Sequence, residues 1–215
     1  MTEIEKHYNK HKEENRLLTR HGKVEFAVAM KYIHDFLPTQ DKRLFKIADI
    51  GAGTGRYSVA LAKEGFDVTA VELVKHNLEI LESKHERVKC WPGNALDLSF
   101  LPDETFDATI VFGPLYHLHK EKEKLTALKE ARRITKKGGT IFAAYLLNEY
   151  SILSYCFAQN RITDLIKSKN ISNDFHIIPK ENELYDYVRL EDIDRLNKLS
   201  ELKRIKIFSP DGPAD

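Results

Sequence analysis

The sequence predicts an α/β fold, a doubly wound and mostly parallel sheet with helices on both faces and a helical cap after the fifth strand. Short apolar runs alternate with helical patterns from residue 45 onward, and three closely spaced glycines follow the first of these runs. Strands separated by helices of this length form parallel sheets that are covered on both sides. A chain of 215 residues is long enough to bury the core of one such domain.

The first expected strand covers residues 45–52, because a continuous apolar run rich in Ile and Ala is typical of a strand buried on both faces. A helix is expected over 54–65, where apolar residues recur at helical spacing and Gly65 can cap the end. A later helix over 120–136 is expected to stop at Gly138 and Gly139. The remaining core elements are expected as a strand at 67–73, a helix at 75–86, and strands at 88–93, 106–113 and 140–146.

We expect a single domain, residues 1–215, in four parts. They are an N-terminal helical lid (1–40), a central core (44–147), a cap (148–189), and a last helix and strand (190–215). The lid contains an amphipathic helix at 22–37 that Pro38 ends. The cap is rich in aromatic residues and too long for a simple connection, so we expect it to fold as helices over the sheet. The two final elements are expected at 190–199 and 202–208.

The charge balance argues against a nucleic-acid partner. There are 34 Lys and Arg against 33 Asp and Glu, for a formal net charge of +1, whereas nucleic-acid binding usually shows as a basic face or a high pI. Cys90 and Cys156 lie far apart without metal-ligand spacing, so we interpret them as reduced thiols. The N-terminus is too charged for a signal peptide, and the longest apolar run is far shorter than the ~20 residues of a membrane span. We expect a cytoplasmic protein with no membrane partner, and the oligomeric state stays open.

The glycine-rich loop after the first strand is the most informative motif. Gly51, Gly53 and Gly55 allow a tight turn and the close approach of a ligand to the main chain. The loop leads into a helix N-terminus, whose free N–H groups favour oxygen and negative charge. Glu72 stands at the end of the second expected strand, where an acid can accept hydrogen bonds from both hydroxyls of a ribose. The pattern therefore favours an adenosine-type ligand, although a glycine loop alone could also be only a tight strand-to-helix turn.

A dinucleotide such as NAD is disfavoured by one residue. The dinucleotide fingerprint G-x-G-x-x-G would place its third glycine at position 56, which is Arg56 here. The spacing in this chain is G-x-G-x-G, which lacks the pyrophosphate arrangement. A dehydrogenase is therefore the weaker interpretation.

Three stretches in order resemble the class I S-adenosylmethionine-dependent methyltransferases. Residues 47–73 are similar to the family's first two motifs, 91–118 to the segment from the third strand through the fourth, and 128–146 to the following helix and fifth strand. The resemblance covers roughly residues 45–150. It implies a Rossmann-like sheet, bound S-adenosyl-L-methionine as cofactor, and methyl transfer as the activity.

The resemblance also implies roles for individual residues. The glycine loop, including Ala52, would line the methionine and ribose parts of the cofactor, and Glu72 would hold the ribose hydroxyls. Leu73 would pack beside the adenine, while Asn94 and Ala95 would contact the adenine amino edge. Asn94 stands where the family commonly has an acid, and its amide oxygen can still accept a hydrogen bond. At the end of the fourth strand, Phe112 and Gly113 would flank the sulfonium.

The C-terminal part departs from the family pattern. The family sheet has seven strands, the seventh antiparallel and inserted between the fifth and sixth. We count six expected strands here, of which the last is 202–208, so either the seventh strand is missing or the sequence stops short of a longer chain. This departure bears on the far edge of the sheet and one side of the substrate pocket.

Candidate catalytic residues follow the fourth strand. Tyr116 and His117 would face the sulfonium, and an imidazole that titrates near neutrality could accept a proton from the acceptor. The alternative is that His117 only packs and hydrogen-bonds within its loop. His117 and His119 are two potential metal ligands, but no third ligand has a fitting spacing, so we expect no metal.

Residues outside the core are candidates for the substrate or lid side. Arg20 could pair with a carboxylate of the cofactor or substrate, with His21 beside it and Tyr8 upstream in the same lid. A solvated arginine and a surface histidine are the alternatives. Tyr150, in the aromatic-rich cap, could frame an apolar acceptor or belong to the core of the cap.

The leading interpretation is a methyltransferase for a small-molecule acceptor. Methyl transfer from a sulfonium needs alignment more than activation, and a general base is required only when the acceptor holds its proton. One alternative is an RNA or protein acceptor, which the balanced charge disfavours. The other is a cofactor-binding module without catalysis, which a fold alone does not exclude.

Overall fold

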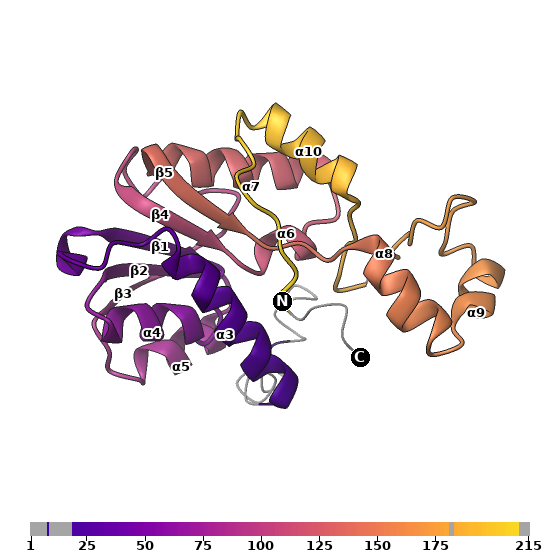
Figure 1. Cartoon of the computed structure of the whole chain (residues 1–215), viewed down its shortest axis with the longest axis horizontal. Helices are drawn as coiled ribbons and strands as arrows, with labels where there is room; N and C mark the ends of the chain where they lie inside the picture. The colour runs from indigo at the N-terminus through magenta and orange to yellow at the C-terminus, as the bar shows by residue number, and fades with distance from the viewer. Residues whose placement is uncertain (1–7, 9–18, 181–182, 211–215) are drawn as a thin grey trace.

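The computed structural model describes residues 8, 19–180 and 183–210. Its centre is a five-stranded sheet in the order β3-β2-β1-β4-β5, in which every neighbouring pair is parallel. This confirms the doubly wound α/β fold (Figure 1). The strands are β1 (Lys46–Ile50), β2 (Asp67–Glu72), β3 (Val88–Pro92), β4 (Phe106–Val111) and β5 (Thr135–Ala143).

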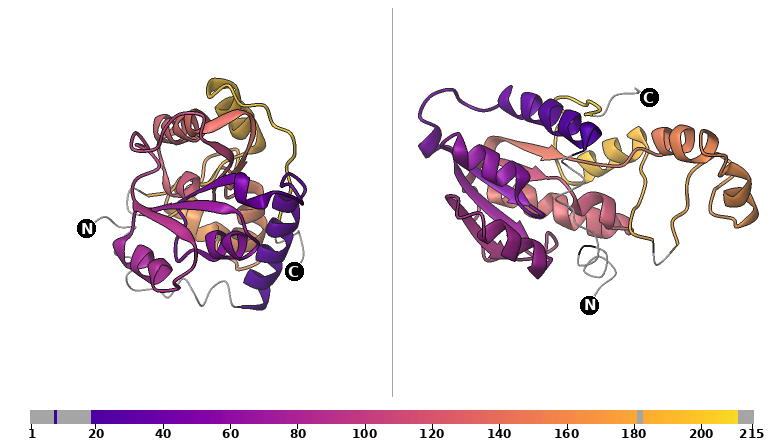
Figure 2. Two further views of the ribbon diagram at one scale, coloured as in Figure 1. Left: turned by 90° about the vertical axis from the view of Figure 1, so that its left-hand side faces the viewer. Right: turned by 90° about the horizontal axis from the view of Figure 1, so that it is seen from below.

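Helices cover both faces of the sheet. In chain order they are α3 (Arg20–His34), α4 (Arg56–Lys63), α5 (Lys75–Glu82), α6 (Pro114–His117), α7 (Glu121–Ile134), α8 (Asn148–Ser151), α9 (Ile162–Lys167) and α10 (Leu190–Leu199), with a 3₁₀ turn at Lys42–Leu44 and a π-helix at Ile152–Phe157. Figures 1 and 2 show α3, α4 and α5 on one face and α7 with α10 on the other.

The two faces of β1 show how the core forms. Side chains alternate across a strand, so Ile47 joins the cluster that α3 and α4 complete with Ile33 and Leu61. The next residue, Ala48, faces the opposite cluster, which α7 and α10 complete. Because both faces of β1 are covered, its sequence is apolar almost throughout rather than alternating between apolar and polar residues.

Two glycines that were expected to end a helix lie instead within β5. The helix stops at Ile134 and the strand begins at once, so the prediction that the helix would continue to residue 136 was wrong. The register between β4 and β5 shifts after Phe106, and Gly138 takes a positive φ of 81° there. A Cβ on Gly139 would lie 2.7 Å from the Asp107 carbonyl oxygen. The glycine pair therefore makes a bulge, which a side chain would block.

The expected sixth strand at 202–208 is absent, since this described segment carries no strand. The preceding helix was predicted correctly as Leu190–Leu199. The segment is held along α3 by side chains rather than by backbone pairing: the Phe208 ring stacks on Tyr32 with centroids 3.9 Å apart, and the Lys206 ammonium lies 4.2 Å from the Tyr32 ring centre. A period-two apolar pattern can fit this arrangement as well as a strand.

The region after β5 is helical only in its first half. Helix α8, the π-helix and α9 lie within residues 148–167, and the chain from 168 to 189 has little regular structure. Ile152, Cys156 and Ile177 form a small core of their own. The buried Asn148 side chain donates to the Phe175 carbonyl at 2.9 Å and accepts from the Ile177 N–H at 2.8 Å. Figures 1 and 2 show this helical region projecting to one side of the sheet rather than covering it.

The N-terminal helix begins close to its expected start. Thr19 caps α3 by accepting the Gly22 N–H at 3.1 Å, a common role for threonine at a helix start. The expectation for residues 1–18 lies outside the described residues, apart from Tyr8. Within the described ranges, no helix combines the length and apolar character that crossing a membrane requires.

Candidate functional site

The loops after β1 and β4 meet at the carboxyl edge of the sheet. These strands are neighbours, but the chain leaves β1 toward β2 and leaves β4 toward β5, in opposite directions. A Cβ on Gly113 would lie 3.6 Å from the Gly51 carbonyl oxygen, and one on Gly51 would lie 2.6 Å from Pro114 Cδ. Ligands of open α/β sheets bind where the strand order reverses in this way. The carboxyl edge between β1 and β4 is therefore the candidate ligand site.

The three loop glycines are required for different reasons. All have positive φ, of 75°, 58° and 84° for Gly51, Gly53 and Gly55. A Cβ on Gly55 would lie 2.1 Å from Leu81 Cδ1, whereas one on Gly53 would meet nothing within 4 Å. Packing therefore explains Gly51 and Gly55. Gly53 has its open side free to receive a ligand.

The carboxylate of Glu72 is bound to this loop. It is 5% exposed; one oxygen accepts the Gly53 N–H at 2.7 Å and the other accepts the Val74 N–H at 2.8 Å. Burial raises the pKa of Glu72, while hydrogen bonds from Val74, Gly53 and Asn77 oppose that rise. An ionised carboxylate has about four acceptor positions. Four donors, from Val74, Gly53, Asn77 and Leu73, already approach this carboxylate, so ligand hydroxyls would share its acceptor positions with them.

Asp49 is a second buried acid that the sequence analysis missed. It is 2% exposed, and the Ser58 hydroxyl donates to it. Burial raises the pKa of Asp49 from 3.8 to about 6, and the charge of Glu72 adds to the rise. The sequence did contain a signal for Asp49, an acid inside an apolar strand two residues before Gly51. A buried charge without partners is costly, so an acid at such a position indicates a specific partner or a function.

The predicted adenine side lies along β2 and the loop after β3. Leu73 follows Glu72 and is partly exposed, and the Gly93 N–H donates to the Glu72 carbonyl at 3.0 Å. The amide oxygen of Asn94 already accepts the Leu96 N–H at 3.0 Å, which uses one of its two lone pairs. Ala95 packs partly buried beside the core.

Phe112 belongs to an aromatic row that ties the N-terminal helix to this edge. Its ring centroid lies 5.1 Å from that of Tyr57, which lies 5.1 Å from that of Phe26 on α3. The Arg56 guanidinium lies 4.3 Å from the centre of the Phe26 ring. The residue at the third-glycine position of the dinucleotide fingerprint, Arg56, thus packs on α3.

The two candidate catalytic residues have ring centroids 4.8 Å apart, but their polar atoms face different parts of the molecule. A Cβ on Gly113 would lie 3.7 Å from the Tyr116 hydroxyl oxygen, which places this hydroxyl at the junction of the two loops. The His117 ring contacts other segments: Nε2 lies 2.9 Å from the Tyr8 hydroxyl and Nδ1 lies 2.9 Å from the Leu184 carbonyl oxygen. A carbonyl can only accept, so Nδ1 carries the proton and the Nε2 lone pair of the neutral ring faces Tyr8.

The chain segment that carries Leu184 is fastened at several points. The Tyr185 ring stacks on His117 with centroids 5.3 Å apart, and the Asp186 N–H donates to the Tyr116 carbonyl at 2.8 Å. Lys124, on α7, bonds both the Asp186 carboxylate and the Leu118 carbonyl. The Lys124 and Asp186 side chains are only 4% and 14% exposed. The sequence analysis missed this pair.

The other predicted residues occupy surface positions. Arg20 and His21 lie exposed on the first turn of α3, and Tyr150 lies exposed on α8. Their roles at a substrate or lid side stay predictions.

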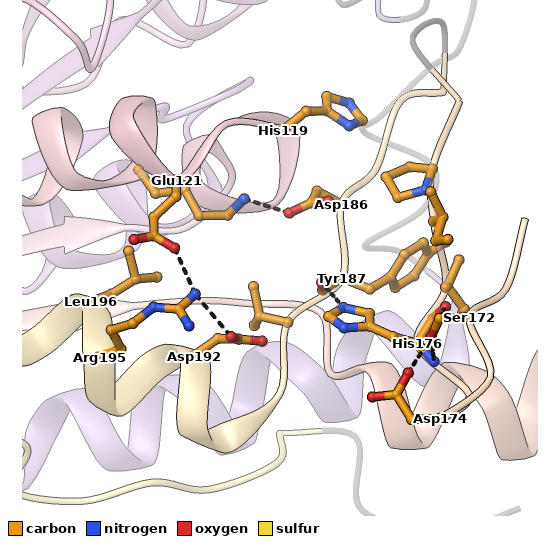
Figure 3. Close-up of a pocket in the computed structure, with 15 residues that line it drawn as sticks. His119, Glu121, Ser172, Asp174, His176, Asp186, Tyr187, Asp192, Arg195 and Leu196 are labelled. Atoms are coloured by element: carbon orange, nitrogen blue, oxygen red, sulfur yellow. Dashed lines mark hydrogen bonds and ion pairs between the residues drawn. The ribbon is translucent and has the colours of Figure 1, made fainter.

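A cavity of about 390 Å³ lies away from the glycine loop, between α7, α10 and the chain from 172 to 188. None of the loop glycines lines it, whereas His119 does. Figure 3 shows one wall with Glu121, Arg195 and Asp192 and the opposite wall with Ser172, Asp174 and His176. Its carboxylates bond to cations: Arg195 to Glu121 and Asp192, Arg189 to Asp174, and Lys124 to Asp186. Among residues 8, 19–180 and 183–210, no cluster of three His, Cys, Asp or Glu could hold a metal.

Residues 48–143 match a family model described as a methyltransferase domain. The match spans the glycine loop, Glu72 and the strand that precedes Tyr116. The chain contains a class I S-adenosylmethionine-dependent methyltransferase domain. This confirms the family that the sequence motifs indicated.

Curated relatives of this methyltransferase domain carry different names. A demethylmenaquinone methyltransferase of Bacillus licheniformis is 38% identical over 43% of this chain and 41% of its own length. A ubiquinone/menaquinone biosynthesis C-methyltransferase of Rhodopseudomonas palustris is 31% identical over 70% of this chain and 60% of its own. A cypemycin N-terminal methyltransferase of a Streptomyces species is 36% identical over 45% and 40%. The chain thus spans 40% to 60% of the length of these relatives.

Solved structures agree on the fold of the methyltransferase domain. A SAM-dependent methyltransferase of Methanosarcina mazei superposes with a TM-score of 0.61 at 20% identity, covering 79% of this chain and 82% of that one. A protein of Pyrococcus horikoshii superposes with a TM-score of 0.56 at 22% identity, covering 81% of each chain. At this identity the likeness shows the fold alone.

Proposed function

We propose that this protein transfers a methyl group from S-adenosylmethionine to a small-molecule acceptor. The observation that carries the proposal is the bond between the Gly53 N–H and the buried Glu72 carboxylate. It joins the loop after β1 to the end of β2 and leaves open space on Gly53. The residues present fit the cofactor, since an open backbone beside an acid at the end of β2 suits a ribose with two hydroxyls.

The residues around this point have distinct proposed tasks. Glu72 accepts the ribose hydroxyls, and the loop of Gly51, Ala52, Gly53 and Gly55 faces the methionine and ribose parts. Leu73 covers one side of the adenine. Asn94 and Ala95 lie at its amino edge, where the second lone pair of the Asn94 oxygen is the available acceptor. Phe112 and Gly113 border the reacting end.

Methyl transfer mainly requires that the protein align the acceptor with the methyl group. S-adenosylmethionine, when bound, supplies a methyl group on a sulfonium and leaves as a neutral thioether. The Tyr116 hydroxyl lies at the junction of the two loops and can orient the acceptor there. Orientation of this kind contributes ~7–11 kcal/mol in favourable cases. His117 is the proposed proton acceptor through Nε2, which carries the lone pair when Nδ1 donates to Leu184 and which the acceptor would reach by displacing the Tyr8 hydroxyl.

The proposed acceptor is a small molecule with a flat ring. Two of the relatives are named for quinone substrates or quinone biosynthesis, which supports an acceptor of that class. The ring centroids of Tyr116, His117 and Tyr185 lie within 6.0 Å of one another; the rings of His117 and Tyr185 are stacked, and Tyr116 meets both edge-on. The relative named as a cypemycin N-terminal methyltransferase supports a different acceptor, an N-terminus. The formal net charge of +1 gives no support to a nucleic acid.

The cofactor is tested by calorimetry with S-adenosylhomocysteine on three proteins. The native protein should bind, and Gly53→Ala should lose at least tenfold in affinity because the new Cβ enters the ligand's space. Gly138→Ala is the matched control, since it also has positive φ and an open Cβ position but lies in the β5 bulge. It should bind as the native protein does. Absence of binding to well-folded native protein would refute the proposed function.

The acceptor is tested with a labelled methyl donor. The protein is incubated with demethylmenaquinone and, separately, with fractions of small molecules, RNA and protein from a cell extract. Label in the demethylmenaquinone or small-molecule product supports the proposal, and mass spectrometry then locates the methyl group. Label that appears only in RNA or protein would exclude a small-molecule acceptor.

A further inference from the structure

The hydroxyl of Tyr145, two residues after β5, is a buried polar group that the proposed mechanism does not use. In the part of the chain that the structure describes, two buried side-chain atoms have no hydrogen-bond partner: the Tyr145 hydroxyl oxygen and Arg189 Nε. Arg189 Nε still lies 3.3 Å from a Glu149 carboxylate oxygen, so it faces an opposite charge. Buried polar groups are nearly always hydrogen-bonded. The Tyr145 hydroxyl is therefore a group that calls for a partner from outside the chain.

Packing alone does not explain a tyrosine at this position. The Tyr145 ring packs against the core cluster that contains Val111 and Leu115, and a phenylalanine ring would make the same contacts without a polar atom. A hydroxyl that is buried without a partner loses its hydrogen bonds to water, which disfavours folding. Proteins keep such groups where activity uses them, even at a cost in stability. A role for the hydroxyl in binding a ligand accounts for its presence.

The backbone places Tyr145 beside the proposed reacting end. Ala143 pairs with Val111 in the sheet, and the Ala144 N–H donates to the Val111 carbonyl at 3.1 Å, so the two chains stay together past the end of the strands. Tyr145 lies two residues beyond Ala143, as Gly113 lies two residues beyond Val111. Tyr145 and Gly113 are therefore at the same edge of the sheet, on neighbouring chains.

A second segment holds the chain around Tyr145 from the other side. The Leu146 carbonyl accepts the Val188 N–H at 3.0 Å, and the Tyr116 carbonyl accepts the Asp186 N–H at 2.8 Å. This short segment thus runs from the loop of Tyr116 to the residue that follows Tyr145. Backbone hydrogen bonds therefore fix the position of Tyr145 relative to both β4 and the candidate catalytic loop.

The order of the strands indicates which ligand lies near Tyr145. Glu72, proposed for the ribose, ends β2, whereas Gly113, proposed for the reacting end, follows β4, and Tyr145 follows β5. Because neighbouring strands are ~4.8 Å apart, β5 lies about 14 Å from β2 across the sheet. Tyr145 is thus on the far side of the reacting end from the ribose, where the methyl acceptor has to approach.

The protonation state of the Tyr145 hydroxyl limits what it can bind. Burial raises the pKa of Tyr145 above its ordinary value, so the hydroxyl keeps its proton at neutral pH. It can donate that proton to a carbonyl or phenolate oxygen. A site that is built to bond an oxygen of its substrate discriminates strongly against an analogue that lacks this oxygen, because the buried hydroxyl is then left unpaired.

We propose that the Tyr145 hydroxyl donates a hydrogen bond to a carbonyl or phenolate oxygen on the ring of the methyl acceptor. Tyr145 is then a specificity-determining residue, and the acceptor must carry an oxygen on its ring. The inference rests on the proposed function, to which it adds this residue and this chemical requirement.

The test compares native protein with Tyr145→Phe, both saturated with S-adenosylhomocysteine. Two probes differ at one position: 1-tetralone has a ring carbonyl where tetralin has a methylene group. In equilibrium dialysis, native protein should bind 1-tetralone at least fivefold more tightly than tetralin, and Tyr145→Phe should bind the two equally. Tyr32→Phe is the matched control, since Tyr32 is also partly buried but stacks on Phe208; it should keep the native preference.

Urea unfolding separates a hydroxyl that serves a ligand from one that serves the fold. Tyr145→Phe removes an atom without a partner among the described residues, so the variant should unfold at the same urea concentration as the native protein or at a higher one. A clear decrease would show that the hydroxyl is bonded within the folded protein, through buried water for example, and would overturn the proposal.

The binding data give two further outcomes against the proposal. Equal binding of the two probes by native protein would overturn it, and so would an unchanged preference for 1-tetralone in Tyr145→Phe. S-adenosylhomocysteine should bind native protein and Tyr145→Phe with the same affinity. Failure of the native protein to bind S-adenosylhomocysteine would instead refute the proposed function, so the two failures are distinguishable.

Discussion

The two sides of the carboxyl edge are held together in opposite ways. On the glycine side, the Gly53 N–H reaches a carboxylate only 19 residues away in the chain. On the other side, His117 contacts the hydroxyl of Tyr8 and the carbonyl of Leu184, which are 109 and 67 residues away. The first side is therefore a local structure, and the second is assembled from three distant segments.

The difference shows which interactions stabilise each side. The glycine side depends on backbone conformations that only glycine adopts easily and on close packing of the loop. The other side depends on side chains that fasten separate segments, above all the buried pair of Lys124 and Asp186. A change in the first should affect the loop alone. A change in the second should alter the geometry of His117 from a distance.

The largest expected effect is on the glycine side, in Gly55→Ala. The residue has a φ of 84°, and the new Cβ would lie 2.1 Å from Cδ1 of the buried Leu81. Left-handed strain costs about 1–2 kcal/mol and overpacking about 1–3 kcal/mol more. The free energy of unfolding in urea should fall by about 2–5 kcal/mol.

Gly138→Ala separates the two causes. It has a similar φ of 81° with nothing within 4 Å of the new Cβ, so only the strain applies and about 1–2 kcal/mol should be lost. Equal losses in the two variants would mean that packing against Leu81 is unimportant. The glycine side would then not differ from an ordinary bulge.

The local side is the one that the sequence predicts well. Gly51, Gly53, Gly55 and Glu72 lie within one short segment, so spacing alone places them at one edge of the sheet. The parallel strands were predicted for the same reason, since each crossover is local. Asp49 was missed because successive side chains of a strand point to opposite faces, so the sequence does not show whether this acid faces a site or solvent. Only the fold shows that it is buried beside Ser58.

The assembled side could not be predicted from the sequence. Nothing in the local pattern around Lys124 shows that Asp186 returns beside it, and a lysine in a charged run is usually solvated. The segment 202–208 has a strand-like pattern but packs on Tyr32 through Phe208. Tertiary contacts decide whether such a segment forms a strand, because a short alternation of apolar residues can pack against a sheet or against a helix.

The second prediction concerns this assembled side. Lys124→Met would leave the Asp186 carboxylate buried without its cation, and breaking a buried ion pair costs about 3–5 kcal/mol. Part of this cost disappears if the segment shifts, so we expect a loss of about 2–4 kcal/mol in urea unfolding. Because Asp186 holds the segment that carries Leu184, the variant should also release Nδ1 of His117.

Nitrogen NMR of labelled histidine measures that release directly. Native His117 should show the Nδ1–H tautomer, and Lys124→Met should show a mixture with Nε2–H; a His117→Gln spectrum assigns the signals. Lys122→Met is the control on the exposed side of the same helix and should leave both stability and tautomer unchanged. An unchanged tautomer in folded Lys124→Met would show that the two sides are not held differently.

The smallest expected effect tests whether the local side is organised for a ligand rather than for stability. The pKa of Asp49 is raised by burial from 3.8 to about 6. A carboxyl with a raised pKa favours folding in its protonated form, so its contribution is complete below pH ~4 and is lost as pH rises through about 6. At 1.36 kcal/mol for each pKa unit, the charged form costs up to about 3 kcal/mol above that pH.

Asp49→Asn keeps an oxygen that can accept from Ser58 but cannot ionise. Its free energy of unfolding should exceed that of the native protein by about 1–3 kcal/mol at pH 8, and the difference should shrink toward zero at pH 4. Asp164→Asn, at an exposed position on α9, should show no such trend. A variant that gains stability while its affinity for S-adenosylhomocysteine falls would show that the glycine side keeps a costly charge for its ligand. If stability instead decreases at pH 8, the buried charge is already compensated within the loop, and neither side of the edge is destabilised for function.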